Sequence, residues 1–486
     1  MISRRFRAIQ GILGVIVMLS SLSKLPPALL ALAWGETGTA EVFFGSFLVS
    51  FVVGAALWAS GRGVQYDLRL RDGFLVVTLT WVFASLVSAL PFVHGPPHLS
   101  YTQAIFEATS GLTTTGATVI DHLQDLPRSV LFYRQLLQFL GGMGIVILAV
   151  AILPMLRIGG TQLFRAESTG PSRDTKLTPR IAETAKLLWG VYFGLTVLCA
   201  AAYWVAGMSL FDAICHAMST VSTGGFSTYD QAFGFWNSPM LECIAIVFML
   251  LGGINFGLHF MAWRRASMGV YGGDSELRAF LRIVLGATLV VGLLLLFGGD
   301  YGTVFGAFRR AAFQVVSAIT TTGFAVPGFD GWTGPAPLIV VGLAFIGGCS
   351  GSTVGGLKVA RVVMVLRQGY REIKQLVHPK AQFVVKMGGK RVSESVVLSV
   401  SGFIAIWMLC FVMLMLAMNL NGLDIESSFG AAAATLTNLG PGLGDVSVSF
   451  GEVGDGAVWL GTLGMVLGRL EVFSLLVLFT PHFWRE

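Results

Sequence analysis

The sequence predicts an all-α integral membrane protein, and three observations support that prediction. First, only 12% of the 486 residues are charged and 54% are hydrophobic, whereas soluble domains have about 25% charged residues. Second, the hydrophobic residues form long runs, several of which approach the roughly 20 residues that a helix needs to cross a bilayer. Third, a pattern of long apolar run, short apolar segment, Thr- or Gly-containing turn and long apolar run occurs four times.

Apolar runs are distributed over the whole chain. They occupy residues 43–60, 74–93, 145–156, 244–256, 283–297, 396–418 and 458–479. Residues 6–34 form a further apolar segment. Arginines precede it, as in a signal peptide, but Lys24 and two prolines interrupt the stretch, so we expect a retained first membrane helix. The five cysteines have no paired spacing, which predicts buried small residues rather than disulfides or a zinc site.

Charged residues separate into two alternating sets of connections. The basic set comprises residues 4–7, 62–71, 157–186, 264–282 and 358–391. The acidic set comprises Asp121, Asp125, Asp230, Asp300, Asp330, Asp424, Glu426, Asp445, Glu452 and Asp455. Basic connections stay in the cytoplasm, which predicts a cytoplasmic N-terminus and explains the net charge of +6 without nucleic-acid binding. The acidic set either raises the cation concentration at an outer mouth or only reflects the scarcity of Lys and Arg in translocated loops.

A Thr- or Gly-containing turn recurs four times, about 100 residues apart. The turns contain Thr114-Thr115-Gly116, Thr223-Gly224, Thr321-Thr322-Gly323 and Asn438-Leu439-Gly440, with Gly116, Gly224, Gly323 and Gly440 as the matching glycines. Short apolar segments precede them at residues 102–111, 210–220, 307–318 and 425–435. The long run before each turn starts from a basic connection and the run after it returns to one, so all four turns should enter the membrane from outside.

Threonine and glycine at membrane depth are typical of a cation path. Irregular backbone is tolerated there only where it lines a cavity. Glycine lets successive carbonyl groups point inward, and threonine adds a hydroxyl oxygen. Four such turns around one axis would form a ring of carbonyl dipoles that replaces the hydration shell of potassium. Glycines that merely pack the helices of a transporter are the alternative, but such glycines belong in mid-helix.

The predicted fold is therefore four pseudo-repeated helix–re-entrant pore loop–helix units around one pore, preceded by two transmembrane helices. The N-terminal two-helix extension covers residues 1–72. The pore units cover residues 73–157, 186–265, 280–378 and 393–486, and the second helix of the third unit is interrupted.

A cluster of glycines interrupts the second helix of the third pore unit. Its candidate gating residues are Gly347, Gly348, Gly351, Ser352, Thr353, Gly355, Gly356 and Lys358. Each glycine inside a helix costs about 1 kcal/mol, so the cluster predicts a broken helix and an intramembrane gating loop beneath the turns. A phosphate-binding loop would need Ser or Thr directly after the lysine, whereas Val359 follows Lys358.

Arg469 is the other candidate gating residue, because a charge inside the last apolar run is costly and usually faces a cavity or a partner. Glu471 lies two residues away and would point to a different helix face. We expect Arg469 to face the pore or the gating loop, as a positive charge that opposes cation passage when the gate is shut. An arginine that snorkels near a helix end is the alternative.

Other polar residues allow weaker predictions. Asn255 and His259 lie four apart on a return helix and should form a packed polar pair. Glu107, Asp212 and His216 lie in the predicted re-entrant helices, where they either tune cation affinity or cap and orient the helix. The basic segments 158–186 and 367–391 are candidate docking surfaces for a partner or for anionic lipid headgroups.

Taken with residues 347–358 and 468–471, the four turns resemble the Trk/Ktr/HKT superfamily of potassium transporters, and most of all its bacterial TrkH branch. The resemblance extends over nearly the whole chain. It implies potassium uptake across the bacterial cytoplasmic (inner) membrane by a homodimer with one pore per protomer. It also implies regulation by a cytosolic ring of the TrkA type, which would bind the nucleotide, with no covalent cofactor on this chain. Gly116 implies potassium rather than sodium, whereas Asn438, Leu439 and Pro441 depart from the other turns.

Other functions stay open. A secondary active cation symporter would show inverted halves, but the four repeats share one orientation. A less selective monovalent cation channel fits the irregular fourth turn. A membrane-embedded enzyme would need carboxylates or histidines clustered near one interface, and Glu107, Asp212 and His216 are dispersed along the sequence. We therefore expect a transport protein and not an enzyme.

Overall fold

Helices make up almost all of the secondary structure in the computed structural model, which describes residues 2–63, 69–147, 177–325 and 329–484. Six helices are long and apolar enough to cross a membrane, or eight if each of two bent helix pairs counts as one span. Within the described ranges, the strands are limited to the antiparallel pair β1 (Lys386–Met387) and β2 (Lys390–Arg391). The chain is therefore all-α, as predicted.

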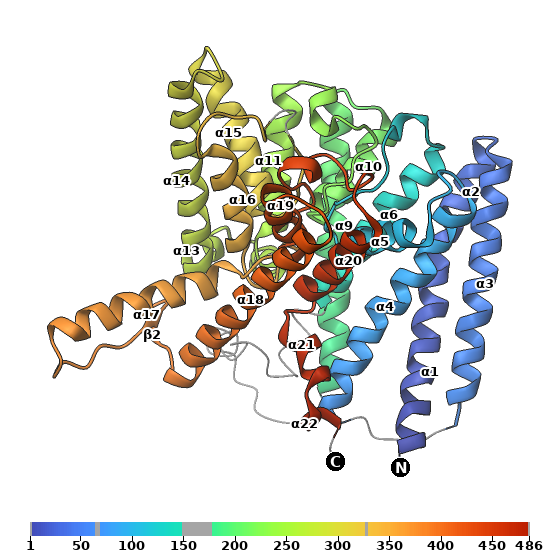
Figure 1. Ribbon diagram of the computed structural model, residues 1–486, viewed down its shortest axis with the longest axis horizontal. Helices are drawn as coiled ribbons and strands as arrows, with labels where there is room; N and C mark the ends of the chain where they lie inside the picture. The colour runs from blue at the N-terminus through green and yellow to red at the C-terminus, as the bar shows by residue number, and fades with distance from the viewer. Residues whose placement is uncertain (1, 64–68, 148–176, 326–328, 485–486) are drawn as a thin grey trace.

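The helices follow one another in the predicted order (Figure 1). First come α1 (Ile2–Ser21), η1 (Leu22–Lys24), α2 (Leu25–Ala33) and α3 (Thr37–Gly61). A first set consists of α4 (Leu70–His94), α5 (Tyr101–Leu112), η2 (Leu123–Asp125) and α6 (Arg128–Ile147). A second consists of α9 (Leu177–Val205), α10 (Leu210–Val221), η4 (Ala232–Phe235), α11 (Pro239–Gly253) and α12 (Phe256–Arg265).

Two more sets complete the chain. After α13 (Gly269–Gly273), the third set consists of α14 (Ser275–Gly298), α15 (Val304–Ile319), α16 (Ala336–Ile346) and α17 (Val359–Val377). The fourth consists of α18 (Glu394–Leu420), α19 (Ile425–Leu436), η5 (Gly444–Val446), α20 (Asp455–Arg469) and α21 (Phe473–Leu476), followed by η6 (Val477–Phe479) and α22 (Pro481–Trp484). Of the expected first pore unit, residues 148–157 lie outside the described residues, as does the basic connection up to residue 176.

The N-terminal helices α1 and α3 lie side by side (Figure 1). They pack closely because Gly14 and Gly54 face each other between them. A Cβ on Gly54 would lie 2.8 Å from the backbone nitrogen of Met18 and 2.9 Å from the carbonyl oxygen of Gly14. Backbones this close leave no room for a larger side chain. At its other end, α1 is joined to α4 by a 2.7 Å ion pair between Arg5 and Asp72.

The short helices α5, α10, α15 and α19 begin in the same way. The N-cap residues Ser100, Ser209, Thr303 and Asp424 each accept a hydrogen bond from a backbone N–H one turn further on. The C-cap residues of all four helices are buried, namely Thr113, Ser222, Thr320 and Thr437. Each therefore brings the partially negative C-terminal end of a helix into the interior, where it favours a cation.

The helices that return from the turns are broken in the second, third and fourth sets. α11 and α12 meet at 96°, and α20 and the following segment meet at 104°. α16 ends at Ile346, and its C-cap Gly347 has a φ of 73°. Two expectations are corrected by these breaks: Asn255 is the N-cap of α12 and so does not share a continuous helix with His259, and Arg469 is the last residue of α20 rather than an interior one.

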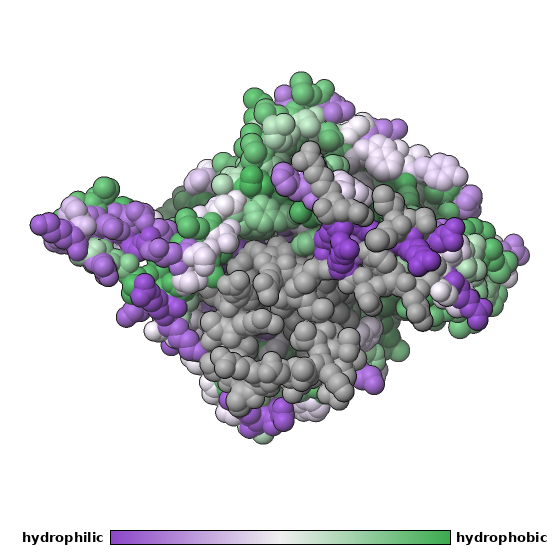
Figure 2. Space-filling view, turned by 90° about the horizontal axis from the view of Figure 1, so that it is seen from below, coloured by the Kyte–Doolittle hydropathy of each residue, from purple (hydrophilic) through white to green (hydrophobic). Residues whose placement is uncertain are grey.

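α17 and the β1–β2 hairpin form an arm that projects sideways from the bundle (Figure 1). Seen from below, hydrophilic residues gather on this arm (Figure 2). α17 also exposes apolar side chains at the spacing of one helix face, namely Leu366, Tyr370, Ile373 and Val377. The arm is therefore amphipathic, with an apolar face that no other described segment covers.

We predict that Gly54→Leu lowers the melting temperature of the detergent-solubilised protein, because the added side chain must push α1 away from α3. Overpacking of this kind costs about 1–3 kcal/mol. Gly45→Leu on the same helix is the matched control, since nothing lies within 4 Å of a Cβ at that position. A thermal scan that gave equal shifts for the two variants would contradict the packing described above.

Candidate cation-binding ring

The four turns that follow α5, α10, α15 and α19 share one backbone geometry. We number each turn from its helix C-cap: residues 113–116, 222–225, 320–323 and 437–440. The second positions have positive φ, at 51° for Thr114, 54° for Thr223, 46° for Thr321 and 58° for Asn438. The fourth positions are glycines of positive φ, at 85° for Gly116, 81° for Gly225, 76° for Gly323 and 98° for Gly440. Positive φ is uncommon outside glycine, so its recurrence shows that the turns are true equivalents.

This equivalence corrects the second turn by one residue. From the sequence, Gly224 was matched to Gly116. The structure instead has Gly225 at the fourth position, which is equivalent to Gly116, and Gly224 at the third position. The two glycines are adjacent and differ only in backbone conformation. Only Gly225 has the positive φ that the fourth position requires.

A repeated hydrogen bond closes each helix end. The third residue of every turn donates its N–H to a carbonyl five residues back, over distances of 2.8 to 2.9 Å. The pairs are Thr115 with Ser110, Gly224 with Ser219, Thr322 with Ser317, and Leu439 with Ala434. This is the bonding of a helix that ends in a left-handed residue.

The four turns contact one another in a closed ring. A Cβ on Gly116 would overlap the carbonyl oxygen of Gly224. In the same way, a Cβ on Gly225 would overlap the carbonyl oxygen of Thr322, and a Cβ on Gly323 would overlap the carbonyl oxygen of Leu439. The ring closes where a Cβ on Gly440 would lie 2.6 Å from the carbonyl oxygen of Thr115. Each fourth-position glycine thus lies against the third-position carbonyl of the next turn. We call these sixteen turn residues the ring; its backbone oxygens can replace the water around a monovalent cation.

A cavity of about 330 Å³ lies on one side of the ring. Gly116, Gly225 and Gly323 line it together with residues that follow the turns, and the carboxylates of Asp230 and Asp330 lie in its wall. Carboxylates at the mouth of a site raise the local concentration of cations. Asp230 also accepts a 3.0 Å hydrogen bond from the backbone of Leu123, which joins two of the segments around the cavity.

Glu107 orients the segment that leaves the first turn. It forms a 2.8 Å ion pair with Arg134, and both side chains are buried. The same carboxylate accepts hydrogen bonds from the Thr118 hydroxyl and from the Val119 N–H, both at 3.0 Å. Arg134 also donates to the carbonyl of Ser227, in the segment after the second turn. Buried charges persist only when they are paired and hydrogen-bonded in this way.

Asp212 and His216 have a similar role at the second turn. Asp212 accepts hydrogen bonds from the hydroxyls of Ser209 at 2.7 Å and Thr228 at 2.8 Å. His216 lies 3.0 Å from the Ser227 hydroxyl through Nε2 and 2.9 Å from the Asp212 carbonyl oxygen through Nδ1. Between the two open roles, these contacts favour capping and orientation of the helix. In the described ranges, no group of three or more His, Cys, Asp or Glu could hold a metal ion.

The glycine-rich loop, residues 347–358, lies against the ring on the side away from the cavity. The Thr353 hydroxyl is 2.9 Å from that of Thr223, and the Gly355 N–H donates to the Thr321 hydroxyl at 2.8 Å. The Gly356 N–H donates to the Thr437 carbonyl at 3.1 Å. The loop therefore contacts three of the four turns at their first or second positions.

The other predicted loop residues shape the loop itself. Gly347, Gly351 and Gly356 have positive φ, as does Lys358. The Ser352 hydroxyl donates to the Cys349 carbonyl at 2.6 Å, and the Lys358 ammonium donates to the Val354 carbonyl. A Cβ on Gly348 would lie 3.0 Å from the Gly253 carbonyl, at the break between α11 and α12.

Arg469 lies between the glycine-rich loop and the ring. Its guanidinium donates to the Thr353 carbonyl at 2.9 Å, and also to the Thr113 carbonyl and the Thr114 hydroxyl. Its partner is not Glu471, which forms a 2.6 Å ion pair with Arg361 of α17. The guanidinium thus supplies the contact to the first turn that the loop itself does not make.

Two residues of the site had no signal in the sequence. Glu276, at the start of α14, accepts hydrogen bonds from the N–H groups of Ser350 at 2.8 Å and Ala360 at 3.1 Å. Ser350 lies in the glycine-rich loop, and Ala360 lies just after it. Gln138 of α6 contacts the second turn. Asn255 and His259 have separate partners: Asn255 caps α12, and His259 lies 2.8 Å from the Tyr271 hydroxyl.

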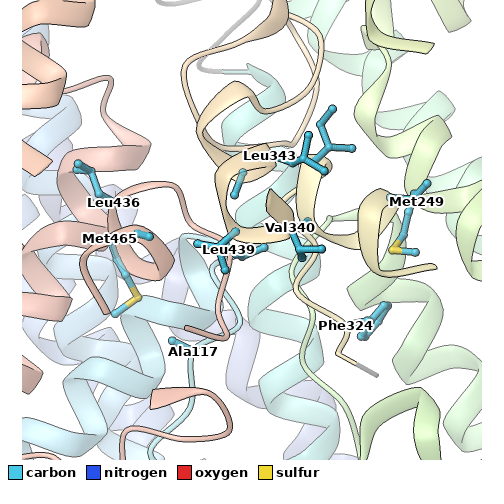
Figure 3. Close-up of a cluster of buried hydrophobic side chains, with 14 of the residues drawn as sticks. Ala117, Met249, Phe324, Val340, Leu343, Leu436, Leu439 and Met465 are labelled. Atoms are coloured by element: carbon cyan, nitrogen blue, oxygen red, sulfur yellow. The ribbon is translucent and has the colours of Figure 1, made fainter. Parts of the chain in front are cut away.

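The fourth turn differs from the others in chemistry. Leu439 is buried in a hydrophobic cluster that also contains Val340 of α16 and Met465 of α20 (Figure 3). The Asn438 amide donates to the Thr115 hydroxyl at 2.9 Å and to the Met465 carbonyl at 3.0 Å. These side chains pack the fourth turn into the core, while its backbone stays equivalent to that of the other turns.

We predict that Glu107→Ala lowers the free energy of unfolding by about 3–5 kcal/mol, because it leaves Arg134 buried without its counter-charge. Thermal denaturation in detergent measures the change. The double variant Glu107→Met, Arg134→Met removes both charges and is expected to regain part of the loss. A double variant less stable than Glu107→Ala alone would contradict this account of the pair.

Comparisons with known proteins agree with this architecture. Residues 39–485 match the TrkH family, described as cation transport proteins. The Trk system potassium uptake protein TrkH of Vibrio parahaemolyticus is 49% identical over 99% of this chain and 100% of its own, and that of Escherichia coli K12 is 46% identical over the same shares. The crystal structure of the potassium transporter TrkH from Vibrio parahaemolyticus superposes with a TM-score of 0.91, at 47% identity, over 99% of this chain and 100% of that one.

Proposed function

This chain belongs to the TrkH family of cation transport proteins, and on that basis we propose that it takes up potassium through the ring. The observation that carries the proposal is the closed succession of four glycine–carbonyl contacts, because a cation inside such a succession would meet backbone oxygens from all four turns. The related Trk proteins of Vibrio parahaemolyticus and Escherichia coli are named for potassium uptake. They are transport proteins, which supports the expectation of a transporter rather than an enzyme.

The proposed setting is the bacterial cytoplasmic membrane, with the N-terminus in the cytoplasm. The basic connections support this orientation, since such loops are retained inside. It places the cavity with Asp230 and Asp330 at the outer mouth and the glycine-rich loop on the inner side. Cations would collect at the mouth, lose water in the ring and then meet the loop.

We propose that the glycine-rich loop and Arg469 form the gate. The loop contacts the second, third and fourth turns and Arg469 contacts the first, so together they contact every turn of the ring. The buried guanidinium would also set a positive charge against an ion on the proposed path, where little water screens it. Passage of potassium requires both to move.

Regulation and assembly follow from the family resemblance. We propose that two copies of this chain form a homodimer. We also propose that a cytosolic regulatory assembly of the TrkA type binds to it and carries the nucleotide. The uncovered apolar face of α17 supports burial against a second protein surface. The basic residues of the hairpin, including Lys386 and Lys390, are suited to acidic surfaces or lipid headgroups.

A less selective monovalent cation channel is the second candidate. The fourth turn favours it, because Leu439 replaces the threonine that Thr115 and Thr322 provide at the third position. The ring is therefore not four-fold in chemistry. Competition between rubidium and sodium in one flux assay separates the two candidates.

We predict that liposomes containing the purified protein take up rubidium in preference to sodium, and that Gly323→Ser reduces this preference about tenfold or more. The serine Cβ would overlap the Leu439 carbonyl, and its backbone would be strained at a φ of 76°. Isotope uptake from equal rubidium and sodium gradients gives the ratio. Gly286→Ser, where a Cβ has open space, is the control. Rubidium uptake unaffected by Gly323→Ser would refute the pore.

We also predict that Arg469→Ala raises rubidium flux in the absence of any regulator, because it removes the bonds to Thr353 and Thr113 together with the charge. Deletion of residues 351–355 should act in the same direction. Initial uptake rates in liposomes are the measurement, and Arg265→Ala on the exposed end of α12 is the control. Unchanged rates in both gate variants would rule out the proposed gate.

A further inference from the structure

We propose that Gln138 is a positioning residue of the ring, whose amide holds the Gly224 carbonyl and thereby sets the discrimination between potassium and sodium. The inference rests on the proposed function, since it concerns the same ring. Gln138 lies on α6, which belongs to the first set of helices, yet its side chain reaches the second turn. It is fully buried.

Three hydrogen bonds fix the Gln138 amide. Nε2 donates to the Gly224 carbonyl at 2.6 Å. Oε1 accepts from the Ser219 hydroxyl at 2.7 Å and from the Phe226 N–H at 3.1 Å. The Gly224 N–H in turn bonds to the Ser219 carbonyl at 2.9 Å. The Phe226 N–H can only donate and the Gly224 carbonyl can only accept, so the orientation of the amide is determined: Oε1 faces the N–H and Nε2 faces the carbonyl.

The Gly224 carbonyl is one of the four oxygens on which the ring closes. It lies against Gly116, at the contact between the first and second turns. Its position therefore affects the spacing of two turns at once. The selectivity of such a ring depends on its size or on the strength of its carbonyl dipoles. The position of the Gly224 oxygen affects the size, and its hydrogen bond affects the dipole.

The first and third turns hold this position with their own side chains. At the third position, the Thr115 hydroxyl bonds to that of Thr113 and the Thr322 hydroxyl to that of Thr320, both at 2.8 Å. Gly224 has no side chain with which to do this. The Gln138 amide occupies the space instead, because a Cβ on Gly224 would overlap it.

The returning helices of the second and fourth sets, α11 and α20, support the same interpretation. Gly141, Gly252 and Gly468 each pack against the carbonyl of the last residue of the short helix in their own set. The residue three positions earlier is Gln138 in α6, but Met249 in α11 and Met465 in α20. Among these three helices, α6 alone has an amide at this place, and it lies beside the turn that has glycine at its third position.

The test measures the ratio of rubidium to sodium uptake in liposomes for Gln138→Met, which keeps the volume and copies Met249 and Met465. We expect the ratio to fall roughly tenfold, the order of magnitude of one lost buried hydrogen bond. Gln135→Met is the matched control: Gln135 is equally buried on the same helix, and its amide has no hydrogen-bond partner among the described residues. Its ratio should stay at the wild-type value.

A rescue variant separates positioning from general damage. Gln138→Ala should lower the ratio in the same way, and Gln138→Ala combined with Gly224→Thr should restore it to within about threefold of wild type. The alanine makes room for the threonine, whose hydroxyl can bond to Ser222 as Thr115 does to Thr113. Gly224 lacks a positive φ, so threonine is allowed there.

The outcomes are distinguishable. A wild-type protein without rubidium uptake would overturn the proposed function itself. A selective wild type with an unchanged ratio in Gln138→Met and Gln138→Ala would overturn only the role of Gln138, even if total flux fell. Equal loss of selectivity in Gln135→Met and Gln138→Met would also overturn it, because a general packing defect would then account for both.

Discussion

The contact between a glycine and the carbonyl oxygen of the next turn is the constraint on which the rest of the structure depends. It occurs four times and closes on itself, and at each place a Cβ would overlap the oxygen or lie 2.6 Å from it. Only a residue without a side chain, in a left-handed conformation, satisfies both requirements. The capped short helices, their buried ends and the ion pair of Glu107 with Arg134 all serve to bring these turns to one axis.

The four sets of helices differ on the side of the ring that faces the glycine-rich loop. Gly142 packs on Ser222, and Gly253 packs on Thr320, so in two sets a glycine of the returning helix meets the first position of the next turn. In the fourth set the residue after Gly468 is Arg469, and its guanidinium reaches Thr113, again the first position of the next turn. A place occupied by glycine elsewhere thus holds the charge that contacts both the ring and the glycine-rich loop.

The fold could be predicted from the sequence to a large extent, because apolar runs and glycine breaks are local signals. The predicted membership of the Trk superfamily and the all-α membrane fold are confirmed. The register of the second turn was wrong by one residue, since adjacent Gly224 and Gly225 differ only in φ. Gln138 and Glu276 were missed because their partners lie 74 to 88 residues away, and no local pattern reports such a contact.

Contacts of this distant kind connect both proposed gate elements to α14 and α17. Glu276 bonds to Ser350 in the loop and to Ala360 just after it, so the loop is anchored at two points to the start of α14. Arg361, in the first turn of α17, pairs with Glu471, two residues beyond Arg469. Any force that displaces α17 therefore acts on the end of the loop and on the segment next to Arg469 together. Since α17 is part of the projecting arm, a protein that displaced this arm would act on both of the proposed gate elements.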